Sequence, residues 1–228
     1  MLRRWNATLL AIVLSCAAFG RDVRENARSF PLDSAQGLVA IGGDVKVVTY
    51  RGQRAVQLTP APGRMEADGD MVAILTGTEF HDGTIEIKVA GAPRTGAPAD
   101  ARGFIGVGFR VQEKGSKGEY LYLRPTNARC DDQVRRNHST QYVSAPDYPW
   151  ERLRKESPGM YESYVDLEPG VWTQMKIVVA GTKARLYVNG AQQPALVVND
   201  LKLGESHGQI ALWAHSTTEA YFSGLSIQ

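Results

Sequence analysis

The last quarter of the chain, residues 172–228, consists of short segments in which apolar residues recur at every second position. Met175, Ile177 and Val179 share one face of such a segment, and the next segment repeats the pattern. A period of two predicts β-strands, because successive strand side chains point to opposite faces. The intervening Asn189-Gly190 is a strong turn signal, since both residues tolerate positive φ. Several short strands at this spacing predict an antiparallel sandwich.

Segments of the same kind occupy most of the chain before residue 125. Glycine and proline recur between them, and helical signals are weak throughout. We therefore expect an all-β protein. The expected strands in this part are Leu38–Ile41, Val45–Tyr50, Ala55–Thr59, Met71–Thr76, Gly83–Val89, Phe104–Val111 and Tyr120–Leu123.

The first twenty residues have the layout of an export signal. Arg3 and Arg4 precede an apolar run, Ala7–Ala18, that is short for a membrane span. Small residues before Arg21 suit a cleavage site. We expect residues 1–20 to be a signal peptide and residues 21–228 to form a single sandwich domain, secreted or periplasmic.

The cysteines leave one alternative open. Val13-Leu14-Ser15-Cys16 fits a lipobox loosely, so a lipid anchor on Cys16 competes with simple secretion. Removal of residues 1–20 leaves Cys130 alone, and a lone cysteine cannot form an internal disulfide. The hydrophobic core must then supply the stability without a cross-link.

The expected mature chain carries no net charge. The whole chain has 26 basic and 24 acidic residues, and residues 1–20 include two arginines and no acid. A neutral chain without a basic stripe argues against nucleic acid as the main partner. No helix-length apolar run follows residue 20, so we expect no membrane insertion of the mature domain.

Six segments between Phe80 and Leu225 carry a resemblance to known proteins: Phe80–Glu86, Gly106–Arg110, Trp172–Ile177, Leu186–Gly190, Gly208–Trp213 and Ala220–Leu225. Together they resemble the concanavalin A-like lectin/glucanase superfamily, and within it the laminin-G-like domains and the 3-keto-disaccharide hydrolase domains. The resemblance covers Phe80 to Gln228 and extends more faintly back to Phe30. It implies a jelly roll of two stacked antiparallel sheets that handles a saccharide on the concave sheet or its rim.

The chain departs from some members of this superfamily. It lacks the E-x-D-x-x-E strand of the retaining laminarinase-type enzymes, and the N-terminal strand with a tryptophan that the keto-disaccharide enzymes carry is not evident. The nearest acidic run is Glu162–Glu168. If that run were a strand, Glu162 and Asp166 would share a face and could act as a carboxylate pair on a glycosidic bond.

Strand parity provides the best candidate for a binding surface. If Phe104–Val111 pairs with Tyr120–Leu123, one sheet face carries aromatic rings beside arginines. Such a surface suits pyranose rings, which have apolar faces and hydroxylated rims, and nearby glycines would let a ligand approach the backbone. The alternative is a covered sheet face with cross-strand Arg–Tyr packing. The side chains concerned are Arg110, Tyr120, Tyr122 and Arg124.

The stretch Pro125–Met160 breaks the strand pattern. A loop of this length in a compact domain is usually functional or disordered, and its aromatics and prolines speak against disorder. We expect an ordered excursion over one sheet face; a solvated loop with internal ion pairs is the alternative. The candidates here are Asp132 and His138 as acid or base, Arg135 and Arg136 as a clamp, and Tyr142 and Trp150 for stacking on a sugar or pinning the loop.

Nothing in the sequence predicts an organic cofactor, since no glycine-rich phosphate loop follows a strand. EF-hand and zinc-type spacings are also missing. Jelly rolls of this superfamily often hold calcium, and the resemblance leaves calcium open. The nearest pairs of carboxylates are Asp68 with Asp70 and Asp131 with Asp132.

Three functions stay open from the sequence. The first is a carbohydrate-recognition domain that binds an oligo- or polysaccharide without turnover. The second is an enzyme that cleaves a glycosidic bond, a hydrolase or lyase of the 3-keto-disaccharide type. The third is a laminin-G-like module that binds a protein. The enzyme would need one or more of Asp132, His138, Glu162 and Asp166 beside the aromatic face.

Overall fold

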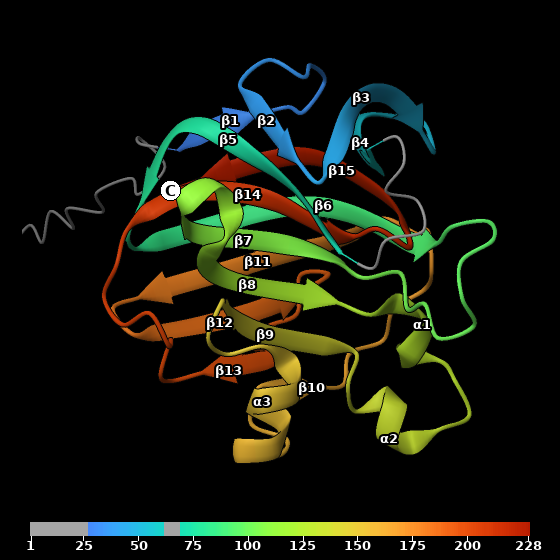
Figure 1. Ribbon diagram of the computed structural model, residues 1–228, viewed down its shortest axis with the longest axis vertical. Helices are drawn as coiled ribbons and strands as arrows, with labels where there is room; N and C mark the ends of the chain where they lie inside the picture. The colour runs from blue at the N-terminus through green and yellow to red at the C-terminus, as the bar shows by residue number, and fades with distance from the viewer. Residues whose placement is uncertain (1–26, 62–68) are drawn as a thin grey trace, which may run out of the picture.

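The computed structural model describes residues 27–61 and 69–228, and these form two antiparallel sheets stacked face to face (Figure 1). The expected signal peptide with Cys16, and Asp68, lie outside the described residues. Within the described residues, sheet A has the order β13-β12-β11-β6-β15-β4-β3, with β1 pairing to β15. Sheet B has the order β10-β9-β8-β7-β14-β5-β2. The predicted all-β jelly-roll sandwich is confirmed.

The chain passes several times from one sheet to the other, so some neighbouring strands, such as β6 and β15, are distant in sequence. Sheet A consists of β1 (Arg28–Phe30), β3 (Gly43–Tyr50), β4 (Gln53–Pro60), β6 (Gly83–Pro93), β11 (Thr173–Ala180), β12 (Lys183–Val188), β13 (Leu196–Val198) and β15 (Thr218–Ile227). Sheet B consists of β2 (Leu38–Ile41), β5 (Asp70–Phe80), β7 (Ile105–Gln112), β8 (Lys117–Leu123), β9 (Thr140–Ala145), β10 (Glu162–Ser163) and β14 (Gly208–His215).

Helices are short and lie at one end of sheet B (Figure 1). None of those in the described part of the chain is long and apolar enough to cross a membrane. They are α1 (Pro125–Ala128), α2 (Gln133–Arg136) and α3 (Trp150–Glu156), and a single turn, η1 (Glu113–Gly115), joins β7 to β8.

The main core fills the space between the sheets. Met175, Ile177 and Val179, predicted to share a face, are at most 2% exposed and belong to this core. Leu121 and Leu123 of β8 face it from the other sheet. The period of two therefore predicts correctly which side chains of these strands face the core, because burial of one sheet face requires apolar residues at alternate positions.

All seven strands predicted before residue 125 are present, with ends shifted by a few residues. The expectation that 125–160 is a single excursion is wrong in one respect, because Thr140–Ala145 is the strand β9, paired with β8. Its side chains are mostly buried on both faces, so the segment shows no apolar–polar alternation.

The acidic run after residue 161 is also different from the expectation. Only Glu162 and Ser163 pair as a strand, β10, and the chain then leaves the sheet. Glu162 and Asp166 therefore do not share a strand face. Asp166 is largely exposed and pairs with Arg129, with an oxygen–nitrogen distance of 2.8 Å.

Candidate functional site

One register row crosses the outer face of sheet B and brings together residues from seven strands. Each residue in the row is the direct partner of the next across neighbouring strands. The residues alternate with core residues such as Leu121, so their side chains point away from the sandwich interior. In order from β2 to β10 they are Ile41, Val72, Trp213, Gly106, Tyr122, Gln141 and Glu162.

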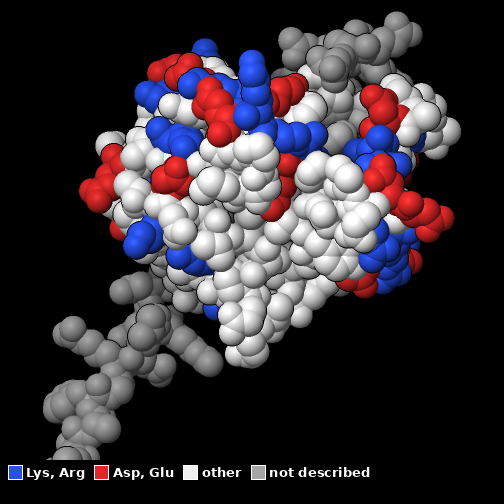
Figure 2. Space-filling model, turned by 90° about the horizontal axis from the view of Figure 1, so that it is seen from below, with Lys and Arg blue, Asp and Glu red and all other residues white. Residues whose placement is uncertain are grey.

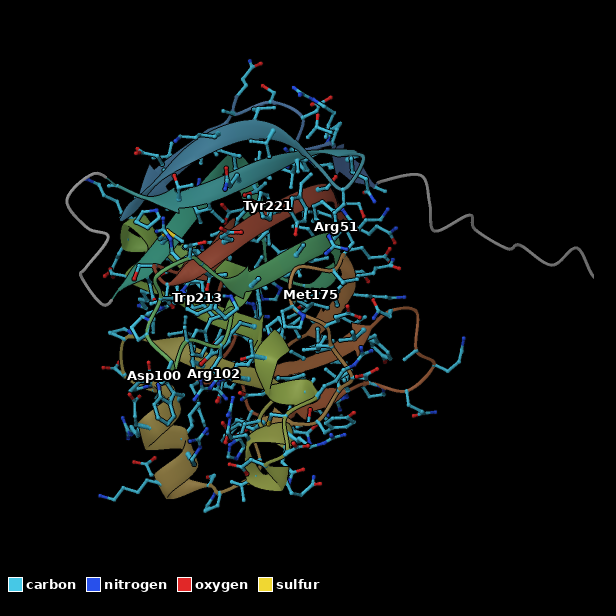
Figure 3. All side chains as sticks on the ribbon, turned by 90° about the vertical axis from the view of Figure 1, so that its right-hand side faces the viewer. Arg51, Asp100, Arg102, Met175, Trp213 and Tyr221 are labelled. Carbon is cyan, nitrogen blue, oxygen red and sulfur yellow. The ribbon has the colours of Figure 1, made fainter. Side chains whose placement is uncertain are left out.

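Aromatic rings form the floor of this face. The Tyr122 and Trp213 ring centroids are 4.6 Å apart. Phe104 lies with its ring 6.3 Å from that of Tyr122 and 5.4 Å from the His215 imidazole. Figure 3 shows Trp213 on the side of sheet B, above Asp100 of the β6–β7 loop. Trp213 is 7% exposed and belongs to a second apolar cluster on this outer face, rather than to the core between the sheets.

The glycines of β7 leave space for tyrosine side chains of β8, and not for a ligand as expected. A Cβ on Gly106 would lie 2.6 Å from Tyr122 Cβ, and one on Gly108 would lie 2.6 Å from Tyr120 Cε1. Real Cβ atoms do not approach so closely. The glycines therefore allow the two neighbouring tyrosine side chains to lie flat across β7.

A polar cluster adjoins the aromatic floor, centred on Arg124 at the end of β8. The Arg124 guanidinium donates to Glu162 Oε1 at 3.0 Å, to Gln141 Oε1 at 3.0 Å and to the Tyr122 hydroxyl at 3.2 Å. Arg154 of α3 donates to the same Glu162 carboxylate, with Nε 2.9 Å from Oε2. Arg124 thus links the aromatic floor to a buried carboxylate.

The cluster has an excess of positive charge. Burial raises the pKa of Glu162, but hydrogen bonds and charge from Arg154 and Arg124 outweigh it, and the net pKa lies below the usual value. Glu162 is therefore ionised at neutral pH and faces two guanidinium groups. Burial also raises the pKa of Tyr122 to about 12, so its hydroxyl stays protonated.

His138 lies beside this cluster in its neutral form. Its Nε2 atom is 3.5 Å from Glu162 Oε2, and its side chain is 21% exposed. Burial, assisted by the nearby Arg154 and Arg124 charges, lowers the pKa of His138 although Glu162 opposes the shift. A neutral imidazole that reaches solvent can accept a proton.

Trp150 covers the arginines from the start of α3. Its ring centroid is 4.5 Å from the Arg154 guanidinium carbon and 5.8 Å from that of Arg124. At 38% exposure it presents part of the indole to solvent beside the polar cluster. The name sheet B site is used for this aromatic floor together with the polar cluster. It consists of Phe104, Tyr122, Arg124, His138, Gln141, Trp150, Arg154, Glu162 and Trp213.

The other half of the outer face is closed. The η1 turn folds over β5 and β8, and it appears in Figure 1 as the light-green coil in front of the sheet. The Tyr120 hydroxyl donates to Gly115 O at 2.7 Å, and Tyr120 is only 3% exposed. Tyr120 therefore supports the turn, and its ring is not open to a ligand.

Arg110 does not lie on the aromatic face, contrary to the parity expectation. A bulge between Phe109 and Gln112 interrupts the ladder, and Arg110 has φ of 53°. Its fully buried guanidinium donates to Asp82 Oδ1 and to three carbonyl oxygens, those of His81, Gly181 and Gly204. Because the bulge shifts parity by one residue, Arg110 holds loops together instead.

Tyr142 also lies elsewhere, in the core between the sheets. It is the direct partner of Leu121, so it shares the inner face, and it is fully buried. Its hydroxyl donates to Glu119 Oε2 at 2.7 Å and accepts from Lys202 N at 2.7 Å. A sugar cannot reach this ring in the folded protein.

The other charged candidates of the 125–160 segment make local contacts. Asp132 Oδ1 accepts from the Val134 and Arg135 amides and caps α2. Arg136 donates to the Tyr164 hydroxyl at 3.2 Å. The Nε of Arg135 is buried and has no hydrogen-bond partner among the residues described. Figure 2, which views the end with α2 and α3, shows basic and acidic side chains interspersed.

Several members of the sheet B site had no clear signal in the sequence. Gln141 lies on the strand that was not predicted, and Arg154 lies on a single short helix. Asp70, opposite His215 in the ladder, is close enough for its charge to raise the pKa of both Tyr120 and Tyr122. Of the four predicted catalytic residues, the structure brings His138 and Glu162 together with Tyr122 and Arg124.

A metal site is not visible in the described ranges, 27–61 and 69–228, where no three His, Cys, Asp or Glu side chains gather to hold an ion. Asp68, one of the carboxylates considered for calcium, lies outside these ranges.

Comparison with protein families gives one match over most of the chain. The model of the 3-keto-alpha-glucoside-1,2-lyase-like domain matches residues 49–228. This confirms the resemblance to the keto-disaccharide type of jelly roll. The comparison with curated protein sequences finds no match.

Solved structures share the fold at low sequence identity. The carbohydrate-binding module CBM66 from Bacillus subtilis superposes with a TM-score of 0.57 and 13% identity, over 84% of this chain and 96% of that one. A putative glycosyl hydrolase from Parabacteroides distasonis gives 0.53 and 12%, over 88% and 98%. The exoplasmic/lumenal domain of VIP36, in its Ca²⁺/Man-bound form, gives 0.56 and 10%, over 90% of each chain. These identities support the fold alone.

Proposed function

The chain belongs to the 3-keto-alpha-glucoside-1,2-lyase-like family, and from this membership we propose that it binds a 3-keto glycoside at the sheet B site and cleaves the glycosidic bond by elimination. One observation supports the choice of site above all. Arg124 is held between the Glu162 carboxylate and the Tyr122 hydroxyl, so charge and an aromatic surface meet at one place. Export through the N-terminal segment is part of the proposal.

The chemistry follows from the ketone at C3 of the sugar. The ketone acidifies the proton on C2, and a base removes it. The electron pair of the C2–H bond then forms the C1=C2 double bond, and the C1–O bond breaks towards the leaving sugar. The leaving oxygen takes up a proton, so the products are an unsaturated keto sugar and a free hydroxyl compound. No water or oxidant is consumed.

His138 is the base in this proposal. Its pKa is lowered, so it is neutral at pH 7 and needs no prior deprotonation. The imidazolium that forms next to the Glu162 carboxylate is stabilised by the opposite charge, with 3.5 Å between the nearest atoms. The same imidazolium can return its proton to the leaving oxygen, which balances the reaction.

The arginines of the site stabilise the negative charge that develops on the C3 oxygen. Arg124 and Arg154 share one carboxylate, so one positive charge is not neutralised locally. Removal of the C2 proton spreads negative charge onto the ketone oxygen as an enolate. A fixed guanidinium in a partly dry site favours that charge without having to reorganise.

Aromatic surfaces of the site position the sugar. Trp150 is the most exposed of them and stands at the edge of the cluster. Its indole offers an apolar face to a pyranose ring, while the guanidinium of Arg154, whose side chain is 34% exposed, presents donors to the hydroxyls.

Recognition of a saccharide without turnover is the second candidate. It is favoured by the shared fold with CBM66, whose description is that of a carbohydrate-binding module. The same site would then bind an unmodified sugar through Trp150 and the partly exposed Arg154. Calcium would enter either proposal as an aid to binding, as in the Ca²⁺/Man-bound form of VIP36.

Proton NMR separates the lyase from the binding protein. Residues 21–228 are mixed with a 3-keto disaccharide or with the unoxidised disaccharide, each with and without calcium. An enol-ether proton signal together with released free sugar supports the lyase, and its loss in His138→Gln assigns the base. Saturation transfer to both disaccharides without turnover supports recognition alone. Asp132→Asn, which alters the cap of α2, is the matched control that should keep full activity.

A further inference from the structure

The outer face of sheet A carries a pocket that lies on the far side of the sandwich from the sheet B site. Figure 3 shows the two sides, with Trp213 towards sheet B and Arg51 towards sheet A. The pocket has a volume of about 370 Å³, at the lower end of the range of about 300–1,000 Å³ for small-molecule sites. Among the residues that line it are Glu86, Gln174, Lys176, Val178, Tyr187 and Gln192.

A straight row of side chains forms the floor of this pocket. Tyr187 of β12 is the direct partner of Lys176 on β11, and Lys176 is the direct partner of Glu86 on β6. The turn after β12 forms the wall, where Asn189 Oδ1 accepts from the Gln174 amide at 3.0 Å. The sheet register and this turn therefore fix the shape of the pocket before any ligand binds.

The polar groups of the pocket have unused hydrogen-bonding capacity. Lys176 Nζ is 3.8 Å from Glu86 Oε1, which is an ion pair but too long for a hydrogen bond. Within the part of the chain that the structure describes, the side-chain amides of Gln174 and Gln192 have no hydrogen-bond partner. One ammonium, one carboxylate and two amides can thus all bind a ligand.

The character of the lining selects a neutral ligand with many hydroxyls. The charges of Glu86 and Lys176 cancel, so a charged ligand would meet one like charge for each opposite one. Strands β6, β11 and β12 each have a partner on both sides, so the pocket presents no free strand edge for a peptide to pair with. The half-buried Tyr187 ring and Val178 add an apolar surface among these donors and acceptors.

We infer that this pocket is a second saccharide site, which binds one neutral sugar unit through the Tyr187 face, Glu86, Lys176 and the two glutamines. It does not rest on the proposed reaction, because none of its residues belongs to the sheet B site. Two sites on opposite faces would let the protein stay attached to a glycan while the sheet B site handles another.

The test is a titration of ¹⁵N-labelled protein, residues 21–228, with methyl α-D-glucopyranoside, trehalose and maltohexaose. The expected result is a saturable shift of the Gln174, Lys176 and Tyr187 amide signals by at least one of these sugars, with a Kd of roughly 1 mM as befits one sugar unit. Tyr187→Ala should weaken that binding about tenfold or more. Glu86→Gln, which keeps the shape, should weaken it less. Lys183→Ala, on the same strand outside the pocket lining, is the control that should change nothing.

Three results would overturn the inference. One is the absence of saturable shifts in this pocket with all three neutral sugars. Another is binding of glucuronate or glucosamine but of no neutral sugar. The third is binding that survives both Tyr187→Ala and Glu86→Gln while the spectra show intact folds. A His138→Gln protein should bind at this pocket unchanged, so failure of the sheet B proposal and failure of this one are distinguishable.

Discussion

The Glu162 carboxylate lies 3.0 Å from the Arg124 guanidinium, and both side chains are almost excluded from solvent, at 3% and 5% exposure. They come from strands at different positions in the chain, β10 and the end of β8, which β9 separates in the sheet. A buried pair of this kind is costly to form and much costlier to break, since one partner left alone is an unpaired buried charge.

Glu162→Gln should therefore lower the free energy of unfolding by about 3 kcal/mol, because Arg124 would stay buried without its counter-charge. Glu168→Gln is the matched control. Its pair with Arg129 is more than half exposed and screened by solvent, so the loss there should be much smaller. Urea unfolding of both variants measures the difference. Equal losses would show that burial of the Arg124 pair adds nothing.

The stabilisation from Glu162 should depend on pH in one direction. Its pKa in the folded protein lies below the ordinary 4.5. The contribution is therefore fully present above that ordinary value and is lost as the pH falls through the folded value. The gap in unfolding free energy between wild type and Glu162→Gln should be constant from pH 7 to about 5 and shrink in more acidic buffer. A gap that grows with acid would contradict the assignment.

His138 should titrate below its ordinary pKa of 6.5, because burial disfavours the imidazolium. If it is the base, kcat/KM should stay level at neutral pH and fall only as the pH drops through this lowered value. His138→Gln should reduce kcat by about a hundredfold or more. NMR titration of the imidazole gives the pKa, and His207→Gln, at an exposed imidazole, is the control. An unchanged kcat in His138→Gln removes His138 from the mechanism.

Tyr142→Phe should affect stability and leave sugar binding intact. The change removes the hydroxyl that bridges Glu119 and the Lys202 amide, and the groups left unpaired cost about 1–3 kcal/mol. Tyr164→Phe removes an exposed hydroxyl that accepts from Arg136 and should cost far less. Thermal or urea unfolding, with a sugar titration alongside, measures both. Weaker sugar binding by Tyr142→Phe alone would return Tyr142 to the site.

Trp150→Ala should weaken sugar binding and leave stability almost unchanged. The indole is 38% exposed and stacks on Arg154, so its loss should weaken saccharide binding about tenfold and change the free energy of unfolding by less than about 1 kcal/mol. Met160→Ala removes a more exposed apolar side chain, at 58%, from the segment after α3 and should leave binding unchanged. Saturation-transfer NMR compares the variants. Identical affinities would exclude Trp150 from the site.

Much of the sandwich follows from local patterns. Alternation along 173–188 and the turn at Asn189-Gly190 gave β11, β12 and their inner faces correctly. Local patterns failed where the ladder is irregular. The bulge after Phe109 reversed the parity of Arg110, and β9, buried on both faces, carried no period of two. Tyr142 was misplaced for the same reason, because its strand was not recognised.

The sequence by itself determined the all-β class, the two-sheet arrangement and which side of β8 carries Tyr122. Only the tertiary structure decided that Tyr122, Gln141, Glu162 and Trp213 lie in one row. The reason is physical. A period of two sets the face of each strand locally, whereas the partner and register of a strand depend on burial shared with segments far along the chain. The site is a property of that register, and no single segment contains it.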